Sequence, residues 1–185
     1  MKLLPITLRE TQLRMIADGD QTMLRRPVGM LSRAAKGDRL WIREPFAFEP
    51  RFDHLSPTAA ASMGARPIFL TEAEARAHNI GCTRFARNLP RACHRWHLRV
   101  LDACEQSLQD IDDADARMEG CADRAAFAAH WNHVHASDGR SITGGRIRWA
   151  DNPRVVAIRF TLIRHPADAP DHRPGTPVHQ QGASQ

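Results

Sequence analysis

Residues 154–163, with the sequence RVVAIRFTLI, form the stretch that decides the fold. β-Branched and aromatic residues dominate this stretch, and such residues favour a strand over a helix. Successive side chains of a strand point to opposite faces, and both faces are largely apolar here. Because a strand that is apolar on both faces needs cover on both, we predict that it lies in the interior of a sheet.

Two earlier stretches also have strand patterns. Residues 39–44, with the sequence RLWIRE, follow the turn signal KGD at residues 36–38. Residues 95–103 alternate in character, which is typical of a half-buried strand. One face of that strand carries Trp96, Leu98 and Val100, and the other, predicted to be a basic outer face, carries Arg95, His97 and Arg99.

Apolar residues at helical spacing predict three helices. The first covers residues 10–18 and ends at Gly19, and a polar loop over 20–26 follows it up to Pro27. The second covers residues 108–120, with Asp110 or Asp112 as its N-cap and Gly120 as its end. The third begins near Asp123 and buries Phe127, Trp131 and Val134.

The remaining segments lack a clear period. Prolines and small residues predict an irregular insertion over residues 47–83, within which residues 71–76 are expected to form one or two helical turns. Prolines and polar residues predict a disordered tail over 165–185, which leaves residues 1–164 as the domain. Strands separated by helices in this order indicate an α+β fold with a small mixed or antiparallel sheet.

Positive charge is concentrated in two parts of the chain. The 185 residues carry a net charge of +5, and 24 arginines stand against two lysines. Five of the arginines lie in residues 84–99, which contain no acidic residue, and residues 140–164 are again basic. Arginine offers a planar fork of donors that suits phosphate and stacks on bases, so a nucleic-acid-binding face is predicted.

Several classes of protein and site are not supported. No run of eighteen apolar residues exists, and the apolar start of the chain stops at Arg9, so we expect a cytoplasmic chain without a membrane span or signal peptide. The four cysteines form no C-x-x-C pair. His130 and His133 share a helix face that His135 does not share, so no metal site and no cofactor are predicted.

Five motifs, in order along the chain, resemble those of the ASCH domain family. DGDQTMLRR at residues 18–26 resembles the family's G-x-K-T-x-T-x-R loop, and GDRLWIRE at residues 37–44 resembles its G-D-x-L-W-V-R-E strand. LPR at residues 89–91 and the helix at residues 107–120 resemble elements of larger, phage-associated members. Residues 149–160 resemble the closing strand.

The resemblance implies a PUA-like small β-barrel with flanking short helices. It also implies a cleft beside the first helix that binds RNA or a modified nucleoside, in a chain we expect to be monomeric. The residues expected to bind the ligand are Gln21, Arg25, Arg26, Arg43, Glu44, Arg91 and Trp149. For the two loop arginines the alternative is an ion pair with Glu44 or Glu119 that only stabilises the fold.

One branch of the family hydrolyses the acetyl amide of N4-acetylcytidine with a lysine, a threonine and a glutamate. The glutamate position matches Glu119, whereas Gln21 and Leu24 stand at the lysine and threonine positions. Glu119 lies near a helix C-terminus, which raises the pKa of a carboxyl group, and Thr22 supplies a hydroxyl from a different position of the loop, with an arginine to stabilise an oxyanion. Glu119 and Thr22 are therefore the candidate catalytic residues.

Three hypotheses for function remain open at this point. The first is a binding module for RNA or a nucleoside-derived ligand in an arginine-lined cleft. The second is a hydrolase, either an amidohydrolase of acylated cytidine or a ribonuclease. The third is a phage-derived module that binds another protein through residues 47–83.

Overall fold

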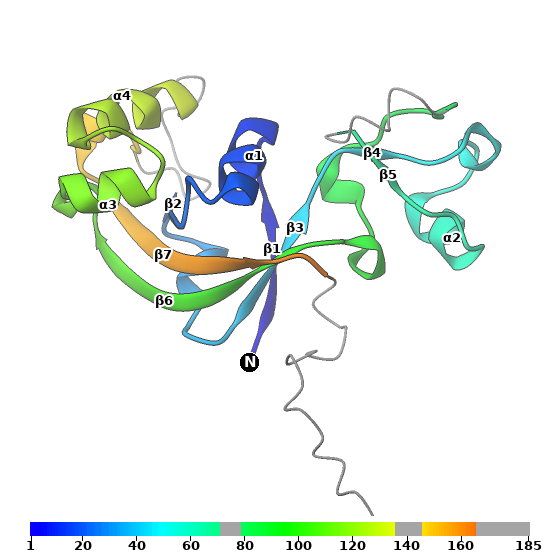
Figure 1. Cartoon of the computed structure of the whole chain (residues 1–185), viewed down its shortest axis with the longest axis horizontal. Helices are drawn as coiled ribbons and strands as arrows, with labels where there is room; N and C mark the ends of the chain where they lie inside the picture. Colours follow the sequence, from blue (N-terminus) through cyan, green and yellow to red (C-terminus); the bar gives the residue numbers. More distant parts are fainter. Residues whose placement is uncertain (71–78, 136–145, 166–185) are drawn as a thin grey trace, which may run out of the picture.

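A five-stranded mixed sheet runs through the computed structural model, which describes residues 1–70, 79–135 and 146–165 (Figure 1). The strands follow the order β1-β3-β6-β7-β2, in which β1 pairs in parallel with β3 and the other pairs are antiparallel. Their bounds are β1 (Leu3–Thr7), β2 (Met23–Pro27), β3 (Arg39–Arg43), β6 (His97–Ser107) and β7 (Arg154–Ile163). The predicted α+β class is confirmed.

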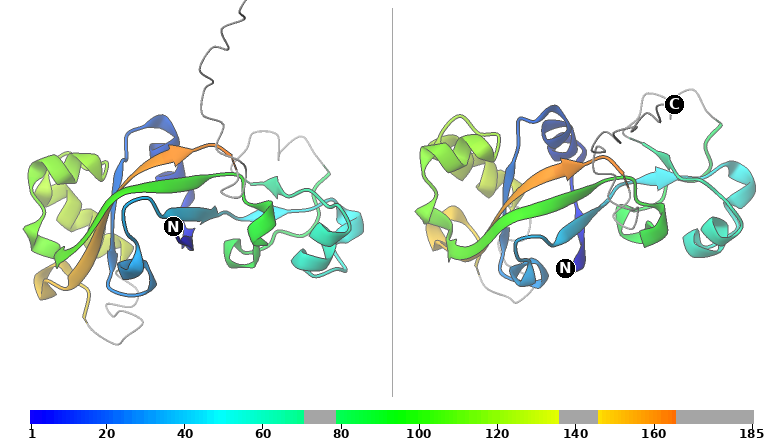
Figure 2. Two further views of the ribbon diagram at one scale, coloured as in Figure 1. Left: turned by 90° about the horizontal axis from the view of Figure 1, so that it is seen from below. Right: turned by 60° about the horizontal axis from the view of Figure 1, so that its bottom comes forward.

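Short helices and 3-10 turns connect and flank these strands. The helices are α1 (Glu10–Asp18), α2 (Pro57–Ser62), α3 (Asp113–Met118) and α4 (Arg124–Val134). The 3-10 turns include η1 (Met30–Arg33), η2 (Pro50–Phe52), η4 (Ala86–Asn88), η5 (Arg91–Cys93), η6 (Leu108–Asp110) and η7 (Trp149–Asp151). In Figures 1 and 2, α3 and α4 lie at one end of the long strands β6 and β7, and α2 lies beyond the other end.

The three predicted strands are present, and β7 lies in the interior of the sheet between β6 and β2, as predicted. The basic outer face predicted for β6 is wrong at His97, which is fully buried. The Nδ1 atom of His97 lies 3.0 Å from the carbonyl oxygen of His165. Burial lowers the pKa of His97 to about 4, so this side chain is neutral near pH 7.

Two strands of the main sheet escaped prediction. β1 (Leu3–Thr7) occupies the apolar start of the chain and pairs with β3. β2 (Met23–Pro27) replaces most of the polar loop predicted over residues 20–26, and it pairs with β7. The loop prediction is wrong because the polarity of two neighbouring arginines concealed a strand whose residue Leu24 is fully buried.

Two helices match their predicted bounds, and one is shorter than predicted. α1 ends at Gly19, whose φ of 88° is in the left-handed region that glycine favours. α4 begins next to Asp123, as predicted, and the side chain of Asp123 caps it by accepting a hydrogen bond from the N–H of Ala126. The helix predicted over residues 108–120 begins only after Asp112, because β6 and η6 occupy the preceding residues.

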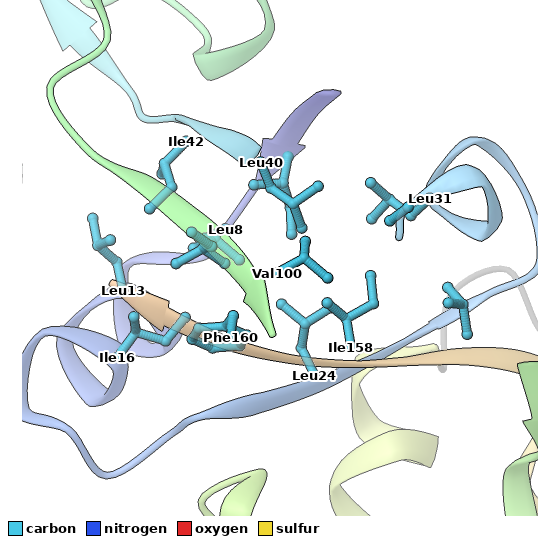
Figure 3. Close-up of a cluster of buried hydrophobic side chains, with 14 residues drawn as sticks. Leu8, Leu13, Ile16, Leu24, Leu31, Leu40, Ile42, Val100, Ile158 and Phe160 are labelled. Carbon is cyan, nitrogen blue, oxygen red and sulfur yellow. The ribbon is translucent and has the colours of Figure 1, made fainter. Parts of the chain in front are cut away.

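The largest hydrophobic cluster draws side chains from all five strands and from α1 (Figure 3). Leu24 of β2, Leu40 of β3 and Ile158 of β7 are fully buried within it. A second cluster joins α3 and α4 to the outer face of β7 through Phe127 and Val155. β1 and β2 are the two edges of this sheet, and no pairing joins them in the residues described. The structure therefore shows a mixed sheet, and within those residues it does not show the closed β-barrel that the resemblance implies.

The prediction that residues 47–83 form an irregular insertion is wrong over its described part, because α2 and β5 (Ile68–Phe69) lie within it and bury apolar side chains. β4 (Phe46–Ala47) pairs with β5, and a third hydrophobic cluster packs beneath this pair. The helical turns predicted within residues 71–76 lie outside the described residues, as does the predicted tail beyond residue 165. Across the three described ranges, no helix is long and apolar enough to cross a membrane.

We expect Leu24→Ala to lower the free energy of unfolding by about 2–5 kcal/mol, because it removes a fully buried side chain from the main cluster. Chemical denaturation measures this change. Leu101→Ala on β6 is the control, because Leu101 is 39% exposed, and it should change stability by only about 0.5 kcal/mol. Equal effects of the two substitutions would contradict the assignment of β2 to the core.

Candidate functional site

Arg25 is buried in β2 and is held by two carboxylates of α3 and its C-cap. Its Nη1 donates to Oε1 of Glu119 at 3.0 Å, and its Nη2 donates to Asp115. The Arg25 side chain is 0% exposed, and its guanidinium lies 5.9 Å from the ring centroid of Phe127. Because a buried charge without a counter-charge is costly, these ion pairs tie β2 to α3.

The end of α3 packs along β2, at the edge of the sheet. The N–H of Thr22 donates to the carbonyl oxygen of Met118 at 2.8 Å. A Cβ atom at Gly120 would lie 2.0 Å from the Cε atom of Met15, so the chain after α3 also approaches α1 closely. Gly120 has a φ of 80°, a conformation that side-chain-bearing residues rarely adopt. The edge strand is thereby covered, and Glu119 is placed beside Thr22.

Glu119 is the C-cap of α3 and is 9% exposed. Burial raises the pKa of this carboxyl to about 6, although the ion pair with Arg25 and the nearby charge of Arg26 both act to lower it. The raised pKa that the sequence predicted is supported. Its main cause is burial of the carboxyl group, and not the helix dipole that the sequence had suggested. A carboxyl group with such a pKa exchanges its proton near neutral pH, as general acid–base catalysis requires.

Besides Arg25, Arg26 of β2 is a positive charge that acts on Glu119, and Arg9, the N-cap of α1, lies near Arg26. Arg26 is half-buried, and its Nη2 donates to Oε1 of Gln12 at 3.2 Å. Burial and the neighbouring charge of Arg9 lower the pKa of Arg26, and the charge of Glu119 opposes that change. Arg9 in turn donates through Nη2 to the carbonyl oxygen of Val134 at 3.2 Å, so it bridges α1 and α4.

His130 of α4 completes this group. Partial burial and the charges of Arg9, His133 and Arg26 lower the pKa of its imidazole. In the part of the chain that the structure describes, no three His, Cys, Asp or Glu side chains are grouped closely enough to hold a metal ion. We call the following residues the β2–α3 site: Arg9, Gln12, Thr22, Arg26, Glu119 and His130.

The loop residues expected in the cleft have different surroundings. Gln21 is buried, and its Nε2 donates to the carbonyl oxygen of Met23 at 3.0 Å, so it supports its own turn. Thr22 is exposed beside the end of α3. Leu24, which stands at the threonine position of the hydrolase branch, points into the main hydrophobic cluster. Among the three positions of that branch, only Glu119 retains a group able to transfer a proton.

Arg25 and Arg26 were expected to line one cleft together. They are consecutive residues of a strand, so their side chains leave opposite faces of β2. Arg25 forms the ion pair with Glu119 that was the alternative to ligand binding. Arg26 is the arginine of the pair that keeps partial exposure.

Four other expected ligand-binding residues lie elsewhere. Arg43 stacks on Trp41 of the same strand, with its Cζ atom 4.7 Å from the ring centroid. Glu44 is buried and accepts hydrogen bonds from Nη2 and Nε of Arg95 at 2.6 and 3.0 Å. Arg91 is exposed in η5, adjacent to a pocket beyond the other end of the sheet.

Trp149, expected to stack on a base, is half-buried in η7. Its ring meets Phe127 edge to face at a centroid distance of 6.2 Å, and the Cζ atom of Arg124 lies 5.1 Å from its centroid. The backbone N–H of Trp149 donates to Oδ1 of Asn132 at 2.9 Å. Trp149 therefore packs against the α4 cluster, and a ligand could reach only its remaining exposed surface.

Arg9 and Gln12 had not been selected from the sequence. Neither residue belongs to a motif, and a polar residue at the start of a helix is usually solvated. Their relation to Arg26 depends on the strand conformation of β2, which the sequence did not suggest. Had residues 23–27 been recognised as an edge strand beside α1, Arg9 and Gln12 would have been expected near Arg26.

Comparison of the chain with family models, with curated proteins and with solved structures finds no match. No relative therefore assigns a ligand or an activity to the β2–α3 site. Its function has to be inferred from its own geometry and from the five motifs.

Glu119 makes the stability of the chain depend on pH. The folded chain holds the Glu119 proton up to about pH 6, whereas the ordinary pKa is 4.5, so the contribution of Glu119 to stability falls as pH rises through this window. The difference corresponds to about 2 kcal/mol. We expect the unfolding free energy of the wild type, relative to Glu119→Gln, to fall by that amount between about pH 4 and pH 7. A relative stability that rises with pH would contradict the raised pKa.

Proposed function

We propose that the chain is an ASCH-type, PUA-like binding module whose β2–α3 site holds RNA or a modified nucleoside. The observation that carries this proposal is Glu119, a buried carboxyl group with a pKa of about 6 that is paired with Arg25 and also feels the charge of Arg26. The site lies beside the first helix, where the resemblance implies a cleft. A hydrophobic cluster built from five strands and α1 supports a PUA-like arrangement of the sheet.

The side chains of this site suit a nucleoside and its phosphate. Arg9 and Arg26 supply donors for phosphate oxygens, and charge-assisted bonds of this kind are the stronger hydrogen bonds in proteins. Ionised Glu119 can accept a hydrogen bond from an amino group such as N4 of cytosine. The hydroxyl of Thr22 can donate or accept beside it. The net charge of +5 adds an attraction for nucleic acid that does not depend on the nucleotide sequence.

The test is binding of fluorescent single-stranded RNA oligonucleotides, followed by anisotropy over a range of salt concentrations. We expect Arg26→Gln to weaken binding by about tenfold and to reduce the slope of log affinity against log salt by about 1, because one phosphate contact is lost. Arg14→Gln is the matched control. This substitution removes the same positive charge, but from α1. The Arg14 side chain is 67% exposed and pairs with Glu10. It lies two residues beyond Gln12, and so on the other side of the helix.

Two results would contradict the proposal. The first is the absence of salt-dependent binding to any RNA, DNA or cytidine derivative tested. The second is an equal effect of Arg26→Gln and Arg14→Gln on affinity. Either result would remove the β2–α3 site from nucleic-acid recognition.

A hydrolase is the second candidate, and the pKa of Glu119 together with the exposed Thr22 favours it. In that reaction Glu119 would take a proton from the attacking water or from the Thr22 hydroxyl and deliver it to N4 of the cytidine as the amide C–N bond breaks, while Arg26 would stabilise the developing oxyanion. If Thr22 is the nucleophile, a water molecule would then hydrolyse the acetyl-threonine ester and release acetate. The same samples test it when N4-acetylcytidine is added and acetate is measured. Release of acetate that Glu119→Gln abolishes would support turnover, and release that this substitution leaves unchanged would remove the mechanism.

A further inference from the structure

A pocket of about 850 Å³ lies beyond the end of the sheet opposite α3 and α4, between the insertion and the last residues of the main sheet. One side is formed by residues 58–69, which contain α2 and β5. The facing side is formed by residues 90–96 and by Arg164 and His165. Figure 1 shows α2 and β5 far from α3, so this pocket is separate from the β2–α3 site.

The charged side chains that line this pocket are all basic. Arg66, Arg95 and Arg164 contribute guanidinium groups, two histidines join them, and no aspartate or glutamate is among the lining residues. The charge of Arg95 is taken by the buried carboxylate of Glu44, which it binds with two hydrogen bonds. Arg66 and Arg164 are exposed, and neither is paired with a carboxylate within the three described ranges. These two arginines therefore supply the positive charge that a ligand would meet.

Stacked rings and guanidinium groups hold one wall of the pocket in place. The Cζ atom of Arg95 lies 4.4 Å from the ring centroid of Phe69 and 4.2 Å from that of Trp96. Arg164 continues the stack, with its Cζ atom 5.2 Å from the centroid of Trp96. The Nη2 atom of Arg164 also donates to the carbonyl oxygen of Ala17 at 2.5 Å. This wall joins the insertion to the main sheet and orients Arg164 before any ligand binds.

Much of the remaining lining is alanine and proline, including Ala61, Ala65, Pro67 and Pro90, and the hydroxyl groups of Thr58 and Ser62 stand among them. The alanine and proline side chains present apolar surface, and the two hydroxyls can hydrogen-bond a polar edge of a base or a sugar. An anionic group at the two arginines and a flat apolar body against this surface describe a nucleotide better than a simple inorganic anion. The volume falls within the range of small-molecule and cofactor sites.

We propose that this pocket binds a nucleoside phosphate, with the phosphate held by Arg66 and Arg164 and the base against the alanine and proline surface. Two sources carry this chemistry, a free nucleotide and the phosphorylated end of an RNA. The proposal does not rest on the function assigned to the β2–α3 site, because it uses different residues at the opposite end of the sheet.

Calorimetric titration of the full chain with a nucleoside 5′-monophosphate, the matching nucleoside and inorganic phosphate is the test. We expect the monophosphate to bind more tightly than either the nucleoside or inorganic phosphate. Arg66→Gln and Arg164→Gln should each weaken its binding by about tenfold, because each removes a charge-assisted hydrogen bond to phosphate. Arg51→Gln is the matched control. Arg51 lies in the same insertion, is 71% exposed and does not line the pocket.

Exposed arginines can be replaced without loss of the fold, and circular dichroism of each variant checks this. Equal binding of nucleoside and monophosphate, or equal affinity of the Arg66, Arg164 and Arg51 variants, would overturn the proposal. The Arg66→Gln and Arg164→Gln titrations are repeated in an Arg26→Gln background, where a phosphate contact of the β2–α3 site is already removed, so that a further loss of monophosphate binding is assigned to this pocket. Tighter binding of a 5′-phosphorylated RNA than of its 5′-hydroxyl form would identify an RNA end as the source, and equal binding would identify the free nucleotide.

Discussion

The guanidinium of Arg25 lies without solvent exposure in an edge strand and needs negative charge close by. Asp115 and Glu119 supply that charge from one short helix, so β2 and α3 are fixed to each other. The same packing buries the carboxyl of Glu119, and this burial raises its pKa although the charges of Arg25 and Arg26 act to lower it. It also brings Thr22 against Met118, the residue before Glu119. The geometry of the β2–α3 site thus follows from one buried ion-pair cluster.

The pattern of apolar residues along the chain predicted those helices and strands that bury one regular face or both faces. β3, β6, β7, α1 and α4 were found because their side chains follow the period of a strand or a helix. β2 was missed because two of its five residues are arginines, and the carboxylates that pair with the buried one, Arg25, come about 90 positions later in the chain. β1 was missed because five residues at the start of a chain give too short a pattern.

The candidate site shows the same division. Glu119 and Thr22 were selected from the sequence, and the structure brings them together with Arg26 at the end of α3. Glu44, Arg43, Arg91 and Trp149 were selected by the same motifs but lie in other surroundings. A motif fixes the order of residues along the chain, whereas proximity depends on strand register and on which face a side chain leaves. The pocket at the insertion could not be predicted, because its two sides are far apart in the sequence.

A double-mutant cycle in the free energy of unfolding at pH 7 tests the role of the Arg25–Glu119 ion pair most directly. Arg25→Met alone leaves two carboxylates without their cation, and we expect it to cost about 3–5 kcal/mol. Combined with Glu119→Gln, it should cost less than the sum of the two single changes, by at least about 1 kcal/mol. Additivity within about 0.5 kcal/mol would show that the two residues do not depend on each other, and would contradict this account of the site.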